Sequence, residues 1–389
     1  MSPVLPGIAA IAAESIALRR RIHACPELAF EETVTSDLVA ECLTEWGYEV
    51  HRGLGGTGVV GVLRSGSGAR TLGLRADMDA LPLTENTGLP YASVNPGKMH
   101  ACGHDGHTAM LLCAARYLAQ AGGFEGTLNL IFQPAEEGFG GARAMMDDGL
   151  FDRFPCDAVF ALHNMPGLAA GDMAFCEGPM TASSDNVTVT LRGEGGHGAF
   201  PHRARDPMPA AGAIILALQT IVGRDVDPLD AAVISVGSVQ AGEAFNIIPE
   251  QVEMRLSVRT LDAEVRQRVE QRIRALVAGQ AQGFGLQADI RYDRGYPVLV
   301  NDRRMTEFAA AIARDLLGDA RVDAQFRPVM GSEDFAYMLE QVPGCYAYIG
   351  NGTGSRGGCM VHNPGYDFND QILAVGASFW VRLVQGWLA

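Results

Sequence analysis

The sequence predicts an α/β protein with a mainly parallel sheet, interrupted by a smaller inserted α+β domain of the ferredoxin-like βαββαβ type. In the first half, short apolar strands alternate with helical segments, which is typical of a parallel sheet covered by helices on both faces. Three successive strands run into acidic or imidazole residues, where open α/β sheets place their ligand sites. The pattern changes near residue 180 and returns near residue 296. We therefore expect a discontinuous main domain, 1–182 plus 296–389, around an insertion at 183–295.

Apolar periodicity predicts the elements of the main domain. Apolar residues recur every three or four positions over 14–45, which is typical of helices, and a turn is expected around Pro26. Residues 108–121 (TAMLLCAARYLAQA) indicate a buried helix. The other expected elements are strands at 58–64, 71–75, 127–132 and 157–162, a helix near 304–317 and a strand at 345–349.

The insertion is predicted from strict alternation of apolar and polar residues at 186–192 (NVTVTLR), which is typical of a half-buried strand. The order strand, helix, two strands, helix, strand is that of the split βαβ motif. The elements are expected at 186–192, about 207–222, 231–239, 250–259, about 262–282 and 287–293.

Composition and charge exclude several classes of protein. A formal net charge of −15 argues against nucleic-acid binding, which needs a basic surface. The charges near the N-terminus follow the apolar run, the reverse of an export signal, so a helix is expected there. No apolar run is judged long enough to span a bilayer, so no membrane partner is expected. The eight cysteines form no CxxC pair, which predicts reduced thiols and a cytoplasmic protein.

The stretch 100–107 (HACGHDGH) is the densest group of metal-binding residue types in the chain. It holds three imidazoles, a thiol and a carboxylate, all of which are possible metal ligands. Its two glycines allow a turn tight enough for several side chains to converge. Such a loop, opening onto the buried helix at 108–121, predicts a rigid metal site.

Five residues at predicted strand ends or in loops together form a mixed set of thiolate, imidazole and carboxylate donors. The set suits zinc, with manganese, cobalt or nickel as substitutes. Taken singly, each residue has a structural alternative, such as a strand cap or a core thiol. Because five ligands exceed the three of a mononuclear catalytic zinc, we expect two ions that share a ligand and a water. The candidate ligands are Cys102, His104, Glu137, His163 and His362.

Glu136 precedes the candidate ligand Glu137 in a turn framed by Pro134 and Gly138. Adjacent loop residues are expected to point in different directions, so one carboxylate can bind metal while the other faces a substrate. Metal-assisted hydrolysis needs a base that takes the proton of the attacking water and returns it to the leaving group. We assign that role to Glu136; the alternative is a solvated acidic pair.

Eight motifs, in the same order over most of the chain, resemble those of a known family. The motifs are RADMDALP, HACGHDGH, FQPAEEG, HN, GGHGAFPH, FNIIPE, GSEDF and VHNPGYDF. The chain is similar to the hippurate hydrolase and N-acyl-amino-acid amidohydrolase branch of the aminoacylase/carboxypeptidase G superfamily. The resemblance implies that the five candidate ligands match the dinuclear metal ligands of that branch and that Glu136 matches its general base.

The resemblance also implies roles within the insertion. His197 of GGHGAFPH matches a histidine that reaches the active site of a partner subunit and binds the scissile carbonyl oxygen. Asn246 and Arg259 match positions that hold the substrate, including its free carboxylate, which a guanidinium can pair bidentately. The alternative for Arg259 is an ordinary arginine at a strand end.

The chain departs from other branches of the superfamily at Asp77-Met78-Asp79, where those branches place a metal-binding histidine two residues before an aspartate. Cys102 replaces their bridging aspartate. Asp77 and Asp79 are therefore expected to orient ligating histidines. Four further residues are expected to orient ligands or to be structural: Asp105, His107, Glu333 and Asp334.

The expected function is hydrolysis of the amide that joins an acyl or aroyl group to an amino acid, as in hippurate, by a homodimer or tetramer formed through the insertion. The nearest alternative is a dipeptidase or an N-acetyl-diaminopimelate deacetylase with the same dinuclear site. A metal-stabilised binding protein without catalysis and a thiol enzyme that uses Cys102 as its nucleophile are further alternatives.

Overall fold

The computed structural model describes residues 3–355 and 357–389. The chain divides into two compact units, each described by itself. Unit 1 comprises Met1–Gly178, Val300–Arg327 and Asp334–Ala389, and unit 2 comprises Pro179–Leu299 and Pro328–Glu333. The short segment 328–333 therefore packs with unit 2, whereas the sequence had placed it in the main domain. Short strands stand where the chain passes between the units: β7 (Gly178–Thr181) and β14 (Leu299–Asn301).

Unit 1 is built on an eight-stranded sheet of order β1-β2-β4-β3-β5-β16-β6-β15. The four central strands β4, β3, β5 and β16 run parallel, as predicted. The edges are mixed: β1 and β2 form an antiparallel hairpin, and β2 is antiparallel to β4. The strands are β1 (Glu49–Leu54), β2 (Gly58–Ser65), β3 (Thr71–Asp77), β4 (Gly126–Gln133), β5 (Ala158–Pro166), β6 (Met173–Ala174), β15 (Val322–Asp323) and β16 (Gly344–Gly352).

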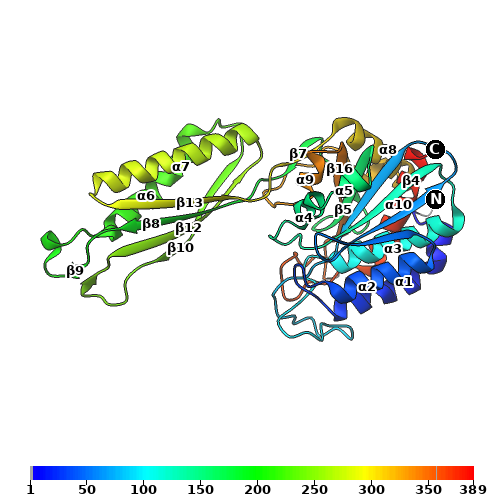
Figure 1. Cartoon of the computed structure of the whole chain (residues 1–389), viewed down its shortest axis with the longest axis horizontal. Helices are drawn as coiled ribbons and strands as arrows, with labels where there is room; N and C mark the ends of the chain where they lie inside the picture. Colours follow the sequence, from blue (N-terminus) through cyan, green and yellow to red (C-terminus); the bar gives the residue numbers. More distant parts are fainter. Residues whose placement is uncertain (1–2, 356) are drawn as a thin grey trace. The chain divides into compact units, whose positions relative to one another are not determined.

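Helices cover this sheet, and α1, α3 and α10 pack against one another (Figure 1). Strand β16 is buried along its whole length, because strands covered on both faces need apolar residues at nearly every position. The helices are α1 (Pro6–Ala24), α2 (Thr33–Glu45), α3 (His104–Ala121), α4 (Gly141–Asp147), α5 (Leu150–Arg153), α8 (Arg303–Leu317), α9 (Ala336–Leu339), α10 (Asp370–Trp387) and the 3₁₀ turn η3 (Asp319–Arg321).

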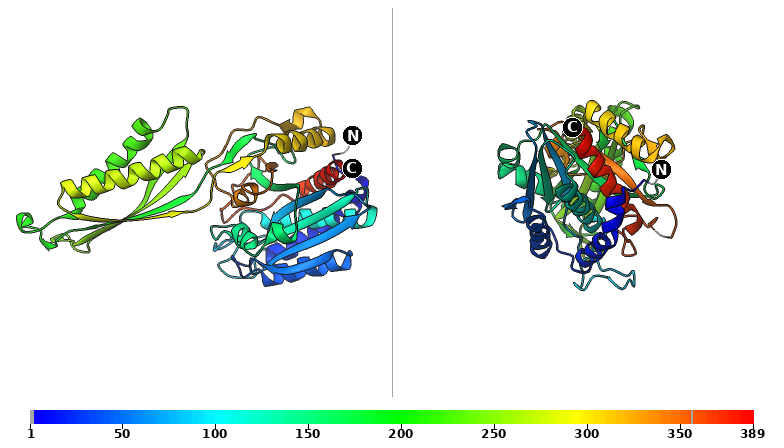
Figure 2. Two further views of the ribbon diagram at one scale, coloured as in Figure 1. Left: turned by 45° about the horizontal axis from the view of Figure 1, so that its top comes forward. Right: turned by 90° about the vertical axis from the view of Figure 1, so that its right-hand side faces the viewer.

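Unit 2 holds a four-stranded antiparallel sheet of order β10-β12-β8-β13, with α6 and α7 on one face (Figure 2). Burial alternates along β12 because only one face is covered. The elements are β8 (Asp185–Arg192), β9 (Gly196–His197), η1 (Pro201–Arg203), α6 (Pro207–Thr220), η2 (Ile221–Asp225), β10 (Ala232–Gln240), β11 (Ile247–Ile248), β12 (Gln251–Thr260), α7 (Ala263–Gly283) and β13 (Gln287–Arg294).

Helix α6 continues into η2 and forms an apolar segment, Pro207–Asp225, that is long and apolar enough to cross a membrane by length and composition. The expectation that no apolar run reaches this length is therefore wrong for this segment. Its buried face, which includes Ile214 and Leu218, packs into the core of unit 2, as a core helix of a folded domain does. Leu216 on its other face is exposed.

Candidate metal centre

The candidate ligands of unit 1 gather where its parallel strands end. Strand β3 ends at Asp77, β4 ends at Gln133 just before the turn that carries Glu136, and β5 contains His163 near its end. Because these strands are parallel neighbours, their carboxyl ends meet at one edge of the sheet. The sequence-based prediction that the polar residues meet at this edge rested on the parallel arrangement of these strands.

Helix α3 begins earlier than the sequence indicated, so His104 and His107 lie in its first turn and not in a loop. The helix can begin here because Gly103 adopts the left-handed conformation, with φ of 92°. Residues three apart lie on the same face of a helix, and the two imidazole rings are 5.5 Å apart between centroids. The helix start therefore fixes the direction of both histidines.

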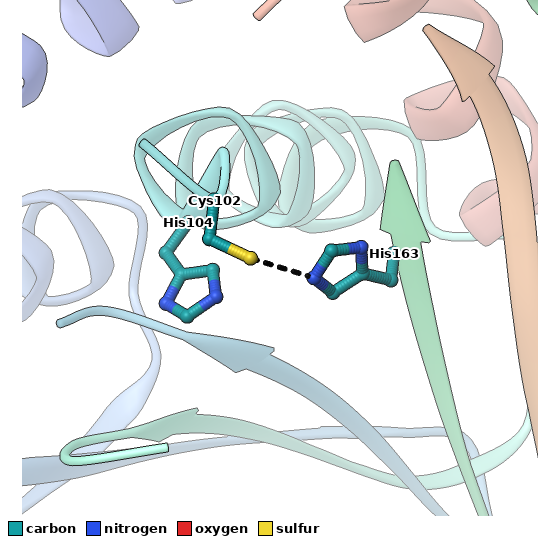
Figure 3. Close-up of side chains that lie close together, drawn as sticks. All are labelled: Cys102, His104 and His163. Atoms are coloured by element: carbon teal, nitrogen blue, oxygen red, sulfur yellow. Dashed lines mark hydrogen bonds between the residues drawn. The ribbon is translucent and has the colours of Figure 1, made fainter. Parts of the chain in front are cut away.

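A first group of donors consists of Cys102, His104 and His163, whose possible ligand atoms all lie within 4.8 Å of one another. In Figure 3 the thiol of Cys102 points to the His163 ring, and the Sγ–Nε2 distance is 3.4 Å. The other ring nitrogen of His163, Nδ1, donates to the carbonyl of Asn164 at 2.6 Å. This hydrogen bond leaves the Nε2 lone pair of His163 facing the thiol.

A second group of donors shares the thiol and consists of Cys102, Glu137 and His362, again within 4.8 Å of one another. The Nε2 atom of His362 lies 3.2 Å from Oε1 of Glu137. The backbone of His362 has a φ of 62°, and its N–H donates to the carbonyl of Ala101 at 2.7 Å. Cys102 belongs to both groups, so its sulfur could serve as a ligand common to both.

The turn that carries both glutamates is tightly held. Ala135 has a φ of 54°, an uncommon conformation for a residue with a side chain, and its N–H donates to Oε1 of the buried Glu32 at 2.9 Å. Oxygens of Glu136 and Glu137 and a ring nitrogen of His104 lie within 4.8 Å of one another. An oxygen of Glu136 also lies within 4.8 Å of a carboxylate oxygen of Asp334. That the two carboxylates serve different partners stays a prediction.

Two aspartates at the end of β3 orient the histidines of α3. Asp79 accepts from Nδ1 of His104 at 3.1 Å and from the backbone N–H of Glu137 at 2.9 Å. Its contact leaves Nε2 of His104 free to bind metal. Asp77 accepts from Nδ1 of His107 at 2.6 Å and from Arg75 at 2.7 Å. Asp77 thus orients His107, which is not among the predicted ligands.

Burial and charge act on the donors in different directions. Burial opposes protonation of His104, but Asp77, Asp79 and Glu137 outweigh it and raise the pKa of His104 to about 10. Burial, reinforced by nearby carboxylates, raises the pKa of the Cys102 thiol well above its usual value. Burial holds the pKa of His163 well below its usual value, so its ring is neutral. The site therefore attracts positive charge, which a divalent ion supplies in place of protons.

The residues fit a pair of divalent ions. Among the described residues, the buried Nε2 of His104 and Oε1 of Glu137 form no hydrogen bond, and Oε1 of Glu137 faces Nε2 of the other proposed ligand His362, as ligand atoms directed at a metal would. A thiolate, imidazoles and a carboxylate form the donor set of zinc and of its borderline substitutes. The overlap of the two groups at Cys102 matches a shared ligand.

Unit 2 carries Glu333 and the three residues predicted within the insertion, and those three lie in two separate places. His197 on β9 and Asn246 just before β11 are both exposed, and His197 pairs with Ile247 across these short strands. They line a hollow of about 420 Å³. Arg259 stands near the opposite end of β12, half-buried, and burial lowers its pKa. Within a single copy of unit 2, the structure therefore does not bring Arg259 together with Asn246.

Sequence reasoning missed a buried charged network behind α3. Asp105 does not orient a predicted ligand: it accepts from Arg19 at 3.1 Å and from His23 at 2.9 Å. Sequence reasoning also missed Arg75, which lies within a buried strand and forms ion pairs with both Asp77 and Asp334. The available signals were a charge inside the apolar run TLGLRAD and arginines on the first predicted helix.

Comparisons with known proteins agree with this α/β architecture and its clustered metal donors. The chain matches Peptidase family M20/M25/M40 over residues 73–386. It is 46% identical to the hippurate hydrolase of Campylobacter jejuni over 99% of each chain, and 40% identical to an N-acetyl-L-cysteine deacetylase of Bacillus subtilis over 94% of this chain and 86% of that one. The crystal structure of a dinuclear metal binding peptidase of the M20 family from Bacillus subtilis matches with a TM-score of 0.84 and 34% identity, over 97% of this chain and 98% of that one.

These matches show the class of protein to which the chain belongs, an α/β protein of the metallopeptidase type, as the eight motifs indicated. The chain belongs to Peptidase family M20/M25/M40. The family resemblance and the α/β fold class predicted from the sequence are confirmed.

Proposed function

We propose that this protein is a metal-dependent amidohydrolase that cleaves the amide bond of N-acyl or N-aroyl amino acids such as hippurate, releasing a carboxylic acid and a free amino acid. The observation that carries the proposal is the pair of donor groups that share Cys102, with Glu136 beside them. The relatives named as hippurate hydrolase and N-acetyl-L-cysteine deacetylase support it, because both names describe removal of an acyl group from an amino acid.

Five residues of unit 1 would hold two divalent ions, most simply Zn²⁺, with Mn²⁺, Co²⁺ or Ni²⁺ as substitutes. When bound, the ions supply a nucleophilic water at neutral pH and polarise the scissile carbonyl. Asp79 keeps the ligand atom of His104 directed at the site. The proposed ligands are Cys102, His104, Glu137, His163 and His362.

Glu136 is assigned as the general base. Its carboxylate is buried, and an oxygen lies within 4.8 Å of the ligand atoms of His104 and Glu137. A carboxylate at this place can take the proton of the attacking water and deliver it to the leaving amine. The strained turn at Ala135 holds the group there, so little reorganisation is needed during the reaction.

The same geometry argues against Cys102 as a nucleophile. The thiolate is the reactive form of cysteine, and burial together with Glu137 and Glu136 raises the pKa of Cys102 well above its usual value. Without a cation the thiol therefore stays protonated and inert. All eight cysteines are free thiols, which supports the proposal that the protein works in the reducing cytosol.

Unit 2 is proposed to complete the site with residues from two copies of the chain. The guanidinium of Arg259 donates to the hydroxyl of Ser257 at 3.4 Å, and among the described residues no carboxylate forms an ion pair with it. It is therefore available for the free carboxylate of an amino acid. Arg259 stands eight residues after Gln251 on β12, so it lies roughly 26 Å along the strand from the end that carries His197. One small substrate cannot span that distance within one unit 2.

A homodimer removes this conflict, because Arg259 of one copy and His197 of another can approach one substrate. Strand β10 is an unpaired edge of the four-stranded sheet and exposes Val233 and Val239. The neighbouring helix α6 exposes Met208 and Leu216. An exposed apolar edge strand readily pairs with a second copy, so we assign this surface to the dimer. A tetramer would need a further surface.

His197 is assigned to the developing oxyanion. Its Nδ1 accepts a hydrogen bond from the N–H of Ala199 at 3.1 Å, so the proton of the neutral ring stands on Nε2. Nε2 can then donate to the scissile oxygen as charge develops there.

A pair of adjacent variants tests the proposal. Glu136→Gln should lower turnover of N-benzoylglycine by at least about 100-fold and keep two ions per chain, because only the base is removed. Glu137→Gln should lose bound metal together with activity. Dipeptides and N-acetyl amino acids, assayed alongside, define the substrate class. Full activity of Glu136→Gln, or no hydrolysis of any acylated amino acid by the metal-loaded wild type, would overturn the proposal.

Mixing inactive variants tests the shared site. Glu136→Gln and His197→Ala should each be inactive alone, and mixed dimers should recover part of the activity because one of their two sites is complete. Mass spectrometry of differently tagged chains confirms subunit exchange. Exchange without any recovery would contradict a site built from two copies.

A further inference from the structure

Asn164, the residue after the proposed ligand His163, is one of the most completely bonded side chains of unit 1. It is 1% exposed and lies on β5. Its side-chain NH₂ donates to the carbonyl of Cys102 at 2.6 Å and to Nε2 of His107 at 3.1 Å. Its Oδ1 accepts from the hydroxyl of Tyr366 at 2.8 Å. Both ends of the amide are thus engaged.

The backbone of Asn164 adds two contacts of the same kind. Its N–H donates to Nε2 of His107 at 3.0 Å, and its carbonyl accepts from Nδ1 of His163 at 2.6 Å. Nε2 of His107 therefore accepts two hydrogen bonds, while its Nδ1 faces Asp77. In this arrangement His107 has no free lone pair for a metal, and it links the start of α3 to β5.

These contacts connect segments that are distant in the sequence but carry four of the five proposed ligands. The Cys102 carbonyl belongs to one ligand, and His163 is the adjacent residue. His107 is three residues after His104 on α3, and Tyr366 is four residues after His362. Of the segments that carry proposed ligands, only the turn with Glu137 forms no hydrogen bond to Asn164 among the described residues.

We infer that the side chain of Asn164 is a positioning group that sets the distances between the ligand-bearing segments, and thereby the affinity for the metal pair. This inference rests on the proposed function, because it assumes that these residues hold the ions. Groups that orient ligands typically change metal affinity by about 10–100-fold when they are removed. Nothing in the role requires Asn164 to touch the substrate.

The test measures metal binding directly, with Co²⁺ as the probe. Wild-type protein should bind two Co²⁺ per chain and show the near-ultraviolet absorption of a thiolate bound to cobalt. Asn164→Ala removes the amide, and Asn164→Asp replaces its donor by an acceptor facing the Cys102 carbonyl. Both variants should raise the Co²⁺ dissociation constant by about 10–100-fold and weaken the thiolate absorption.

Asn129 provides a matched control in the same sheet. It is 2% exposed on β4, and its NH₂ donates to the carbonyl of Pro155 at 3.1 Å, away from the donor groups. Asn129→Ala should lower the stability of the metal-free protein but keep the wild-type Co²⁺ affinity and absorption. A purely structural role of Asn164 predicts the same result for Asn164→Ala, and that result would overturn the inference.

A smaller change covers the case in which Asn164→Ala does not fold. Tyr366→Phe removes one hydroxyl and should raise the Co²⁺ dissociation constant by roughly twofold to tenfold, the effect of one hydrogen bond. Unchanged affinity in Tyr366→Phe would then overturn the inference. A wild-type protein that fails to bind two Co²⁺ would instead overturn the proposed metal centre, so the two failures are distinguishable.

Discussion

Substitution of Gly103 by alanine, compared with the same substitution of Gly47, separates two effects on stability: backbone strain and steric crowding at the candidate metal centre. Its φ of 92° disfavours a side chain, and a Cβ there would lie 2.3 Å from Nδ2 of Asn164 and 2.4 Å from the hydroxyl of Tyr366. Gly47, which follows helix α2, has a similar φ of 86° but nothing within 4 Å of its Cβ position. The two glycines have similar φ values, whereas Gly103 is buried and crowded and Gly47 is exposed and uncrowded.

The expected free energies of unfolding follow from this comparison. Gly47→Ala should destabilise the protein by about 1–2 kcal/mol, the cost of a side chain in the left-handed region. Gly103→Ala adds displacement of two buried hydrogen-bonding groups, at about 1–3 kcal/mol each, because the bonds of Asn164 to Cys102 and to Tyr366 cannot both survive. The total for Gly103→Ala is about 3–8 kcal/mol.

Urea unfolding of metal-free protein, with Co²⁺ binding measured in parallel, provides the assay. Gly103→Ala should unfold at lower urea than Gly47→Ala and bind Co²⁺ more weakly, whereas Gly47→Ala should bind Co²⁺ normally. If the two variants agree in stability within about 0.5 kcal/mol, the crowding argument is refuted.

Three further outcomes are expected. Burial opposes protonation of His23, but Asp105 and Glu85 outweigh burial and raise the pKa of His23 from 6.5 to about 9. The charged His23 therefore stabilises the fold fully below pH 6.5, and this stabilisation is lost as the pH rises through 9. The loss is about 3 kcal/mol in urea unfolding, and His23→Gln should abolish this pH dependence. In unit 2, Arg266→Ala leaves the buried Asp185 without its partner and should destabilise that unit by about 3–5 kcal/mol; a loss below 1 kcal/mol would contradict this. A chelator should remove the ion of the His362 group before the other, giving two phases of metal release, and a single phase would contradict the assignment.

The sequence predicted the parallel strands and the place of the site because both follow from local patterns. Apolar runs that end in Asp77 and His163 indicate buried strands with polar carboxyl ends. The hairpin strand β1 was missed, since EVHRGL has few apolar residues and is half exposed. The start of α3 was placed four residues too late, because glycines and histidines are weak helix formers and only tertiary packing holds His104 in the helix.

Other features of the site have no local signal. The positive φ of Ala135 is held by hydrogen bonds to Gly141, six residues later, and to the buried Glu32, which is far away in the sequence. His107 has the residue type and the spacing of a ligand, yet its two nitrogens are occupied by Asp77 and Asn164. Residue type and spacing indicate which side chains can bind metal, and hydrogen-bond partners, which the sequence does not show, limit which of their atoms are available for it.

The two donor groups differ in exposure, and this difference bears on how a substrate approaches. His104 is completely buried, whereas the side chain of His362 is 52% exposed on a loop with a positive φ. An ion held through His362 would therefore exchange with solvent and chelators more readily than one held by His104 and His163. If the proposed ligands hold two ions, the buried group would be the more protected from solvent and the group with His362 the more accessible to a substrate.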